Sequence, residues 1–163
     1  MKRVHVDIEQ HIATVRLSRP DKHNGMDMAM ILELIATARA LKRDRTLRAV
    51  ILTGDGPSFC AGIDVKSMLG SGKTGAFKLL LPLLKPWTNR YQRVCLIWRT
   101  LSVPVIAAIH GNCFGAGLQL ALGADVRIAA PGARLSVMES KWGLIPDMAG
   151  SVLLREVLPR DVA

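Results

Sequence analysis

The first part of the chain alternates apolar and polar residues with the period of half-buried strands. Residues 4–8 and 12–17 show this pattern, with a short turn between them. A polar loop at residues 18–25 follows, and apolar residues then recur at helical spacing over residues 30–41. Asp27 stands where a helix N-cap is expected. The pattern therefore predicts two strands, a loop and an amphipathic helix.

Longer apolar runs predict the strands that lie deeper in the fold. Residues 103–109 are apolar and β-branched, which is typical of a strand buried on both faces, and residues 49–53 predict another buried strand. The other predicted elements are a glycine-containing loop at 65–81, a helix at 87–101, a helix from Leu118 to about Gly123, a strand at 126–130, an extended segment at 134–137 and a short helix at 150–158. This order predicts an α/β fold with parallel strands, in one domain over residues 1–163.

The length and net charge of the chain exclude few classes of function. A chain of 163 residues can bury one sizeable core, and its net charge of +9 is compatible with three explanations. These are a nucleic-acid partner, a polyanionic small ligand, and an ordinary basic surface that faces an acidic partner. No apolar run approaches the roughly 18 residues of a membrane span, and the charged N-terminus has no signal-peptide core. A cytoplasmic location, away from membranes, is the expectation.

The cysteines and histidines argue against a metal centre. The three cysteines have no CxxC spacing, and the four histidines show no HxH or HxxxH pairing. An odd number of cysteines also argues against a disulfide framework. We predict three buried, reduced thiols and no bound metal.

Small-residue turns follow both buried strands. Residues 60–64 (CAGID) and 115–119 (GAGLQ) occupy equivalent places after the strands, and the second turn opens a helix. Small residues let a ligand approach the main chain closely, and two such turns facing each other offer a pair of N–H donors to one oxygen. Taken singly, either turn is better explained as a plain connection. Together they predict a site for an anion or a developing negative charge.

Five stretches of the sequence, in order, resemble the crotonase, or enoyl-CoA hydratase/isomerase, superfamily. They are LSRPDKHNGMD (17–27), AVILTGDGPSFCAGIDVKSM (49–68), PVIAAIHGNCFGAGLQLALGADVRIA (104–129), ARLSVMESKWGLIPDMAG (133–150) and the helix predicted after it. The resemblance implies a spiral of ββα units that acts on acyl-CoA thioesters, with coenzyme A as part of the substrate and no separate cofactor. Members usually continue into C-terminal helices that cover the acyl pocket and build a homotrimer or a hexamer. This chain is therefore expected to represent the N-terminal part of the fold, truncated at its C-terminus.

The resemblance also assigns roles to the two small-residue turns. It implies an oxyanion hole made by the backbone N–H groups of Ile63 and Ala116. It further implies that coenzyme A contacts the following residues: Lys22, Asn24, Ala61, Gly62, Ile63, Asp64, Val65, Lys66 and Gly115. The two lysines are equally well explained as solvated surface residues.

The catalytic carboxylates of the superfamily map onto three positions. The two glutamates of the hydratases correspond to Gln119 and Glu139, and an amide cannot act as a general base, so Gln119 counts against hydration. One carboxylate is enough to move a proton between two carbons, as in the Δ3,Δ2-enoyl-CoA isomerases, which favours Glu139 as both base and acid. Asp147 matches an acidic position of dienoyl-CoA isomerases and is equally well explained as a helix N-cap.

Several functions therefore stay open, led by an isomerase-type enzyme that forms a CoA-thioester enolate. The alternatives are a hydratase (a lyase) of fatty-acid β-oxidation, a catalytically silent CoA-binding scaffold, and an RNA-binding homologue. RNA would meet the basic residues Arg39, Lys42, Arg43, Arg45 and Arg48. These cations have no aromatic side chains among them for base stacking, so RNA binding is not favoured. Seven apolar residues are explained equally well as the wall of a pocket for an apolar acyl group and as ordinary core residues: Leu79, Leu80, Leu81, Leu83, Leu84, Trp87 and Trp98.

Overall fold

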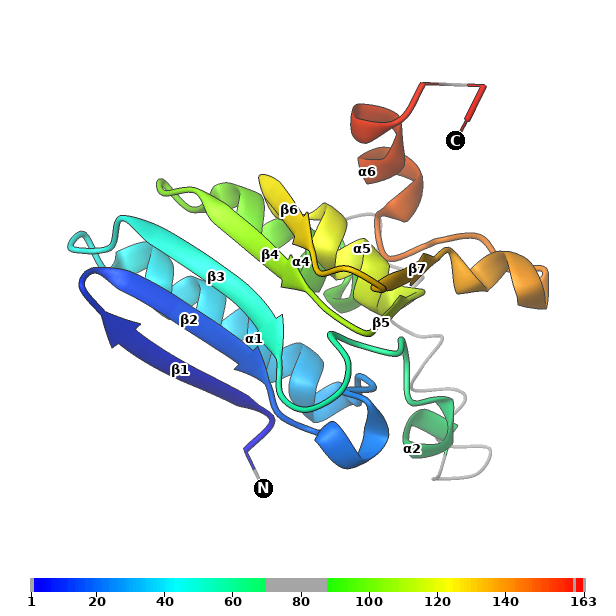
Figure 1. The fold of residues 1–163 in the computed structure, drawn as a ribbon, viewed down its shortest axis with the longest axis horizontal. Helices are drawn as coiled ribbons and strands as arrows, with labels where there is room; N and C mark the ends of the chain where they lie inside the picture. The colour runs from blue at the N-terminus through cyan, green and yellow to red at the C-terminus, as the bar shows by residue number, and fades with distance from the viewer. Residues whose placement is uncertain (1, 70–87, 160, 163) are drawn as a thin grey trace.

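A five-stranded mixed sheet forms the centre of the fold (Figure 1). The structure is a computed structural model that describes residues 2–69, 88–159 and 161–162. The strands, in their order across the sheet, are β1 (Val4–Glu9), β2 (Ile12–Leu17), β3 (Ala49–Gly54), β4 (Val105–Ile109) and β6 (Val126–Ala129). β1 runs antiparallel to β2, and the later neighbours are parallel. The predicted α/β fold is confirmed, with one antiparallel hairpin at its edge.

The N-terminal elements follow the sequence pattern. Gln10 and His11 make the turn between β1 and β2, with positive φ angles of 47° and 66°. Asp27 caps α1 (Met28–Arg43) by accepting a hydrogen bond from the Met30 amide at 2.8 Å. Such a cap satisfies an amide that the first helical turn leaves without a partner, and contributes about 1 kcal/mol. Both strands and the helix are confirmed where the pattern placed them.

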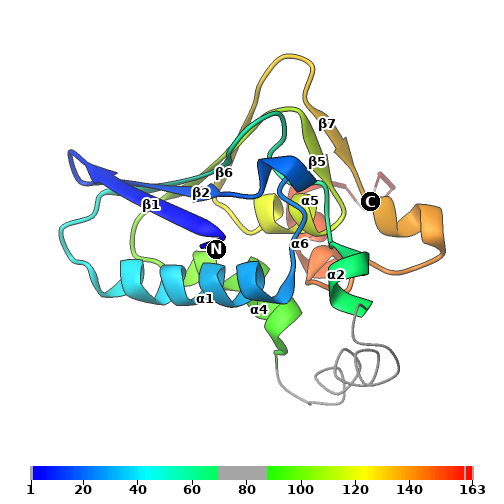
Figure 2. The same ribbon diagram turned by 90° about the horizontal axis from the view of Figure 1, so that it is seen from below.

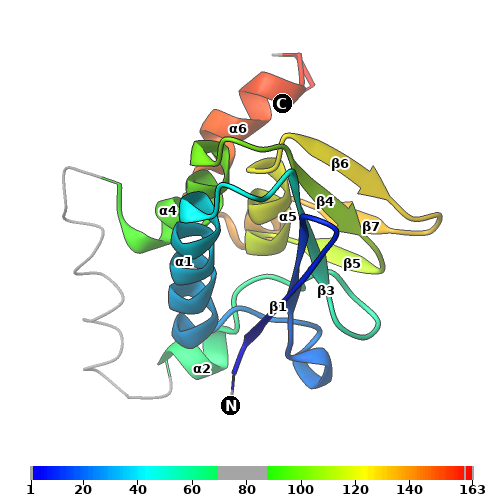
Figure 3. The same cartoon turned by 90° about the vertical axis from the view of Figure 1, so that its left-hand side faces the viewer.

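The helices cover one face of this sheet. α1, α4 (Arg90–Leu96) and α5 (Ala116–Leu122) lie on the same side of it in Figures 2 and 3. The 3₁₀ helix η3 (Ile97–Thr100) continues α4 and carries the buried Trp98. The core between helices and sheet includes Leu17, Met30, Ile31, Leu34, Leu52, Phe59, Trp98, Ile109 and Leu120.

Because of this one-sided arrangement, one face of β4 is only partly buried. Along β4, Val105, Ala107 and Ile109 are buried, whereas Ile106 and Ala108 are only partly buried. The prediction that this run is buried on both faces is therefore wrong. The physical reason is the placement of the helices, which lie on one side of the sheet (Figure 3).

A second, two-stranded sheet follows the main one. β5 (Asn112–Phe114) pairs in parallel with β7 (Arg134–Ser136), so a short strand that the sequence did not predict precedes the second small-residue turn. The chain then forms the 3₁₀ helix η4 (Met138–Trp142) and α6 (Gly150–Val157), which contacts α5. These contacts hold the segment after β7 close to the start of α5.

The remaining predictions need smaller corrections. The loop predicted at residues 65–81 begins with the short helix α2 (Val65–Leu69), and its residues from 70 onwards lie outside the described residues. The polar loop at 18–25 contains one 3₁₀ turn, η1 (Pro20–Lys22).

The helix predicted over residues 87–101 is divided between α4 and η3. It begins at Arg90, because Asn89 and Gln92 form a capping box there. Trp87 and the leucines at positions 79–84 lie outside the described residues. In the part of the chain that the structure describes, no helix is long and apolar enough to cross a membrane.

Candidate functional site

Two small-residue turns meet at the centre of the candidate site. Cys60 and Cys113 form a parallel bridge, in which the Cys60 amide donates to the Asn112 carbonyl at 3.0 Å and the Phe114 amide donates to the Cys60 carbonyl at 2.9 Å. Gly117 packs directly on this bridge, because a Cβ atom there would clash with the Cys60 carbonyl oxygen. The two turns that the sequence predicts to face each other therefore lie side by side.

Each turn leaves one backbone amide available. Gly62 and Gly115 have positive φ angles of 103° and 49°, a conformation that favours glycine, and each immediately precedes that amide. The amides belong to Ile63 and Ala116, and within the described ranges neither donates to a protein acceptor. Met26 fixes the first turn by donating to the Gly62 carbonyl at 2.8 Å.

A cavity of about 740 Å³ lies next to these two amides. Ile63 and Ala116 line it, together with Ala61, Gly62, Val65, Met68, Gly115, Met138, Trp142, Leu144, Ile145 and Met148. Among the described lining residues, three have oxygen-bearing side chains: Tyr91, Glu139 and Asp147. This size and mainly apolar lining are typical of a site for a small organic ligand.

Within the described ranges, one oxygen of the Glu139 carboxylate has a hydrogen-bond partner and the other does not. Oε1 accepts a hydrogen bond from Gln119 Nε2 at 2.7 Å, whereas Oε2 is buried and has no partner among the described residues. The Gly150 amide donates to Gln119 Oε1 at 2.8 Å. Because a main-chain N–H can only donate, the other end of the Gln119 amide must be the donor to Glu139. This chain of hydrogen bonds orients Glu139 and leaves Oε2 as its available oxygen.

Asp147 lies on the same cavity and is exposed. Its alternative interpretation as a helix cap is wrong, because Ala149 is the N-cap residue of α6, and no side-chain cap hydrogen bond is present there among the described residues. Ala149 has a positive φ of 74°. The carboxylate of Asp147 is thus not used by the helix that follows it.

A partly buried ion pair supports the turn that contains Ile63. Arg19 is only 7% exposed, and its guanidinium donates to Asp64 Oδ2 at 2.9 Å and to the Gly25 carbonyl at 2.6 Å. The hydrogen bond from the Ser67 side chain, together with the neighbouring Arg19, lowers the pKa of Asp64 to about 2. The Asp64 carboxylate therefore connects the first small-residue turn to the loop before α1.

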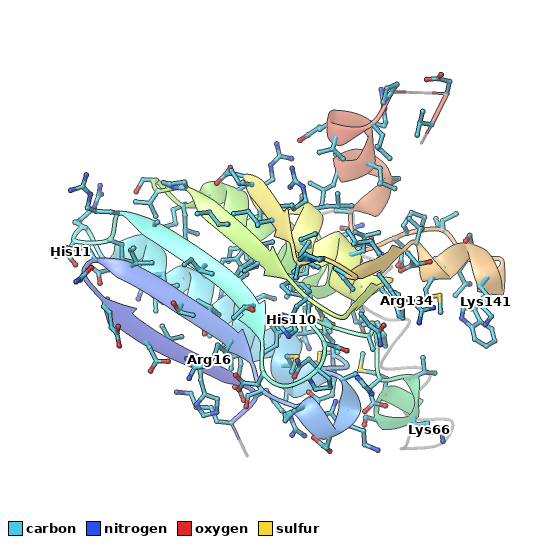
Figure 4. All side chains as sticks on the ribbon, viewed as in Figure 1. His11, Arg16, Lys66, His110, Arg134 and Lys141 are labelled. Carbon is cyan, nitrogen blue, oxygen red and sulfur yellow. The ribbon has the colours of Figure 1, made fainter. Side chains whose placement is uncertain are left out.

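Four of the residues expected to contact coenzyme A are not part of the described cavity wall. Asn24 is fully buried, with its side chain bound to the Arg19 amide and to the Asp55 and Ser58 carbonyls, so it supports the loop. Asp64 is occupied by the ion pair described above. Lys22 and Lys66 are exposed, the latter on α2 (Figure 4). The other five of these residues line the cavity: Ala61, Gly62, Ile63, Val65 and Gly115.

Tyr91 is a cavity residue that sequence reasoning missed. Its position in α4 has the same helical spacing as the core residues Val94 and Trp98, so nothing in the pattern separates it from them. Its hydroxyl oxygen is buried and lacks a hydrogen-bond partner within the described ranges. Burial raises the pKa of Tyr91.

The three cysteines are free and buried, as predicted. Burial raises the pKa of both Cys60 and Cys113 to about 12, and it raises the pKa of Cys95 as well. Their thiols stay protonated near neutral pH. Within the described residues, no group of histidine, cysteine and acidic side chains is arranged to hold a metal ion.

A second, smaller hollow of about 330 Å³ lies beside α1 and contains the basic residues Arg39, Lys42 and Arg93. The other described residues that line it are Thr88, Leu96, Ile97 and Thr100. None of these described residues is aromatic, so the hollow has no stacking surface for a nucleic-acid base.

The fold and the cavity between its two glycine turns define a crotonase-fold protein. The sequence profile of the Enoyl-CoA hydratase/isomerase family matches residues 7–163. The chain therefore belongs to the enoyl-CoA hydratase/isomerase family.

Its relatives carry both isomerase and hydratase names. The chain is 35% identical over 153 residues to the 1,2-epoxyphenylacetyl-CoA isomerase of Escherichia coli (strain K12), covering 94% of this chain and 57% of that protein. It is 32% identical over 155 residues to the mitochondrial Delta(3,5)-Delta(2,4)-dienoyl-CoA isomerase of Mus musculus, covering 92% and 47%. A crystal structure from Thermobifida fusca YX, of a protein assigned as an enoyl-CoA hydratase and bound to acetoacetyl-CoA, matches with a TM-score of 0.82 at 36% identity. That match covers 95% of this chain and 61% of the other, so the chain spans about half to three-fifths of the length of these relatives.

Proposed function

We propose that this chain binds an acyl-CoA thioester in the cavity and catalyses an isomerase-type proton shuttle through an enolate. The ligand class is supported by the family and by the Thermobifida fusca relative, which has acetoacetyl-CoA bound. The two isomerases among the relatives also act on CoA thioesters, as their names state. The largely apolar cavity wall suits the acyl part of such a ligand.

The Ile63 and Ala116 amides are proposed to bind the thioester carbonyl oxygen. Both residues line the cavity and belong to turns that the Cys60–Cys113 bridge holds together. Two N–H donors on one carbonyl oxygen stabilise the negative charge that develops there when the neighbouring carbon loses a proton. A single donor of this kind contributes about 3 kcal/mol to transition-state stabilisation.

The proposal depends chiefly on Oε2 of Glu139, which is buried and has no hydrogen-bond partner in the described part of the chain. Leaving a buried acceptor without a partner costs about 1–3 kcal/mol, so such a group calls for a ligand or a chemical role. In the proposed reaction Oε2 takes a proton from the α-carbon of a 3-enoyl thioester, and the C–H electron pair enters the enolate. Oε2 then gives a proton to the γ-carbon, after exchange of the proton it holds with solvent, and the double bond ends between the α- and β-carbons. The carboxylate returns to its starting state, and no water is consumed.

Gln119 supports isomerisation over hydration. A second carboxylate would be needed there to activate water, and the amide cannot accept a proton for that purpose. Both ends of the amide are already bound, to Gly150 and to Glu139. We assign Gln119 as a positioning residue that holds Glu139, and Asp147 as the second candidate for proton transfer on the same cavity.

The test measures whether the protein removes the α-proton of a bound enoyl-CoA. The protein is incubated in D₂O with a 3-enoyl-CoA, and separately with a 2-enoyl-CoA in ordinary water. We expect conversion of the first with deuterium incorporation, and a decrease in kcat of about 10²- to 10⁴-fold in Glu139→Gln. Glu156→Gln removes an exposed carboxylate from α6 and is the matched control.

Three outcomes of this test differ in meaning. Water addition to the 2-enoyl-CoA that is undiminished in Glu139→Gln would contradict the assignment. A loss in Asp147→Asn with full activity in Glu139→Gln would transfer the role of base to Asp147. Binding of the thioesters without any exchange would leave a silent CoA-binding protein.

A further inference from the structure

Tyr91 carries a buried hydroxyl group that the fold leaves without a hydrogen-bond partner among the described residues. The side chain lies on α4, and the residue is only 6% exposed. A buried hydroxyl without a partner costs about 1–3 kcal/mol, and native proteins satisfy nearly all such groups. Tyr91 is also part of the cavity wall. A ligand in the cavity is therefore the available partner.

The rest of the wall indicates what such a ligand must offer. Glu139 and Asp147 accept hydrogen bonds when they are ionised, and the indole N–H of Trp142 belongs to a residue that is 71% exposed. The other described lining residues have hydrocarbon or thioether side chains, or none. Tyr91 is thus the one buried side-chain donor of the described wall.

The ionisation of Tyr91 agrees with a donor role. Burial raises the pKa of its phenol more than the nearby Arg90 lowers it, and the charge of Asp147 adds to the increase. The hydroxyl therefore keeps its proton at neutral pH and can donate it in a hydrogen bond.

We propose that Tyr91 is a specificity-determining residue whose hydroxyl donates a hydrogen bond to an oxygen atom on the acyl group. The favoured substrates are then acyl-CoA thioesters that carry a hydroxyl, carbonyl or ether oxygen along the acyl chain. A plain hydrocarbon chain would leave the hydroxyl without a partner, and sites built to hydrogen-bond a substrate discriminate against analogues that lack the matching group. The inference rests on the proposed function, because it takes a thioester acyl group as the occupant of the cavity.

The test compares hexanoyl-CoA with derivatives that have a ketone at the fourth or the fifth carbon. Titration calorimetry gives Kd for wild type, for Tyr91→Phe and for Trp142→Phe, which removes the exposed donor of the same wall. We expect wild type to bind one of the ketones about 5- to 30-fold more tightly than hexanoyl-CoA, as one hydrogen bond allows. Tyr91→Phe should lose this preference with an unchanged Kd for hexanoyl-CoA, and Trp142→Phe should keep it.

Equal affinity of wild type for all three ligands would overturn the proposal, even if the variants did not fold. A preference that survives in Tyr91→Phe would also overturn it. Deuterium exchange at the α-carbon of the same ligands separates this inference from the proposed function. A Tyr91-dependent preference for a ketone ligand without deuterium exchange supports the role of Tyr91 and contradicts enolate formation. Deuterium exchange without such a preference supports enolate formation and contradicts the role of Tyr91.

Discussion

Glu139 and Gln119 form a partly buried, hydrogen-bonded pair in which only Glu139 can ionise. Their side chains are joined at 2.7 Å, and Gln119 is 2% exposed. In Gln119→Glu two carboxyl groups would share this site and could not both ionise, so the pair must keep one proton. The stability that this proton provides is fully present at acidic pH and is lost as the pH rises and the proton leaves. We expect Gln119→Glu to lose about 1–3 kcal/mol of unfolding free energy between pH 5 and pH 8, measured by urea denaturation.

Gln10→Glu is the control for this prediction, because Gln10 lies exposed in the β1–β2 turn. Its stability should follow that of wild type across the same pH range. A Gln119→Glu protein that is equally stable at both pH values would show that the site admits water to separate the two charges.

The three thiols lead to a second prediction at the residue scale. The reactive form of cysteine is the thiolate, and burial holds the pKa of Cys60 and Cys113 at about 12. We expect none of the native thiols to react with a disulfide reagent at pH 8, and all three to react in urea. Ser151→Cys adds an exposed thiol on α6 as a positive control. A native thiol that reacts as fast as this added one would contradict the burial.

The position of the two small-residue turns was predictable, because it depends on the main chain. The turns around Ile63 and Ala116 follow from small residues after strands, and the structure brings them to one cavity. Roles that depend on side-chain contacts were not predictable. The Asn24 side chain is held inside the protein by hydrogen bonds to the Arg19 amide and the Ser58 carbonyl. Tyr91 has the helical spacing of a core residue, so its place on the cavity wall could not be predicted.

At the scale of elements, the turn before α5 has to approach the carboxylate closely. A Cβ atom on Gly115 would lie 3.2 Å from Glu139 Oε1, and the residue has a positive φ of 49°. Gly132 has a positive φ of 78° with nothing within 4 Å of such a Cβ, which makes it a matched control. We expect both alanine variants to lose about 1 kcal/mol of stability from backbone strain. Only Gly115→Ala should also lose α-proton exchange, and equal activity of the two would show that Glu139 moves aside freely.

The ion pair between the two loops at the site predicts a pH-dependent stability. The pKa of Asp64 is lowered to about 2 in the folded state, chiefly by the Ser67 hydrogen bond and also by Arg19. A lowered pKa stabilises the fold above the unfolded value near 4, and this contribution is lost as the pH falls towards 2. We expect Asp64→Asn to cost about 1 kcal/mol at pH 7 after allowance for solvent screening, a difference that shrinks below pH 4. Asp21→Asn, at an exposed site in η1, should show no such trend in urea denaturation.

The elements themselves were largely predictable, because each has its own hydrophobic period. α1 follows from apolar spacing and the Asp27 cap, and the β1–β2 hairpin follows from alternation. The partial exposure of the second face of β4 was not predictable. It depends on which elements pack against that face of the sheet and not on the sequence of the strand. The pairing of β5 with β7 is likewise a long-range contact that no local pattern reveals.

For the molecule as a whole, exposed apolar side chains gather in the last third of the chain. They include Val126, Ile128, Leu135, Trp142, Leu144, Ile145, Val152 and Val157. The elements that carry or flank them, β6, β7, η4 and α6, follow one another towards the C-terminal end in Figure 1. Ile128 is 60% exposed on β6, the strand at one edge of the main sheet. A surface of this kind favours association, because burying it removes apolar area from water.

Self-association through this surface is therefore the prediction for the whole molecule, with a trimer as the assembly that the resemblance implies. Sedimentation velocity should show a mass that grows with concentration, and Ile128→Asp should shift it towards the monomer. Leu32→Asp is the matched control, because Leu32 is an apolar residue of α1 that is 46% exposed and lies outside this region. Charged residues at an edge strand oppose pairing, whereas the same charge on an isolated helical face has little to disrupt. A monomer at all concentrations, or an equal effect of both substitutions, would contradict the assignment of the β6–α6 region as the association surface.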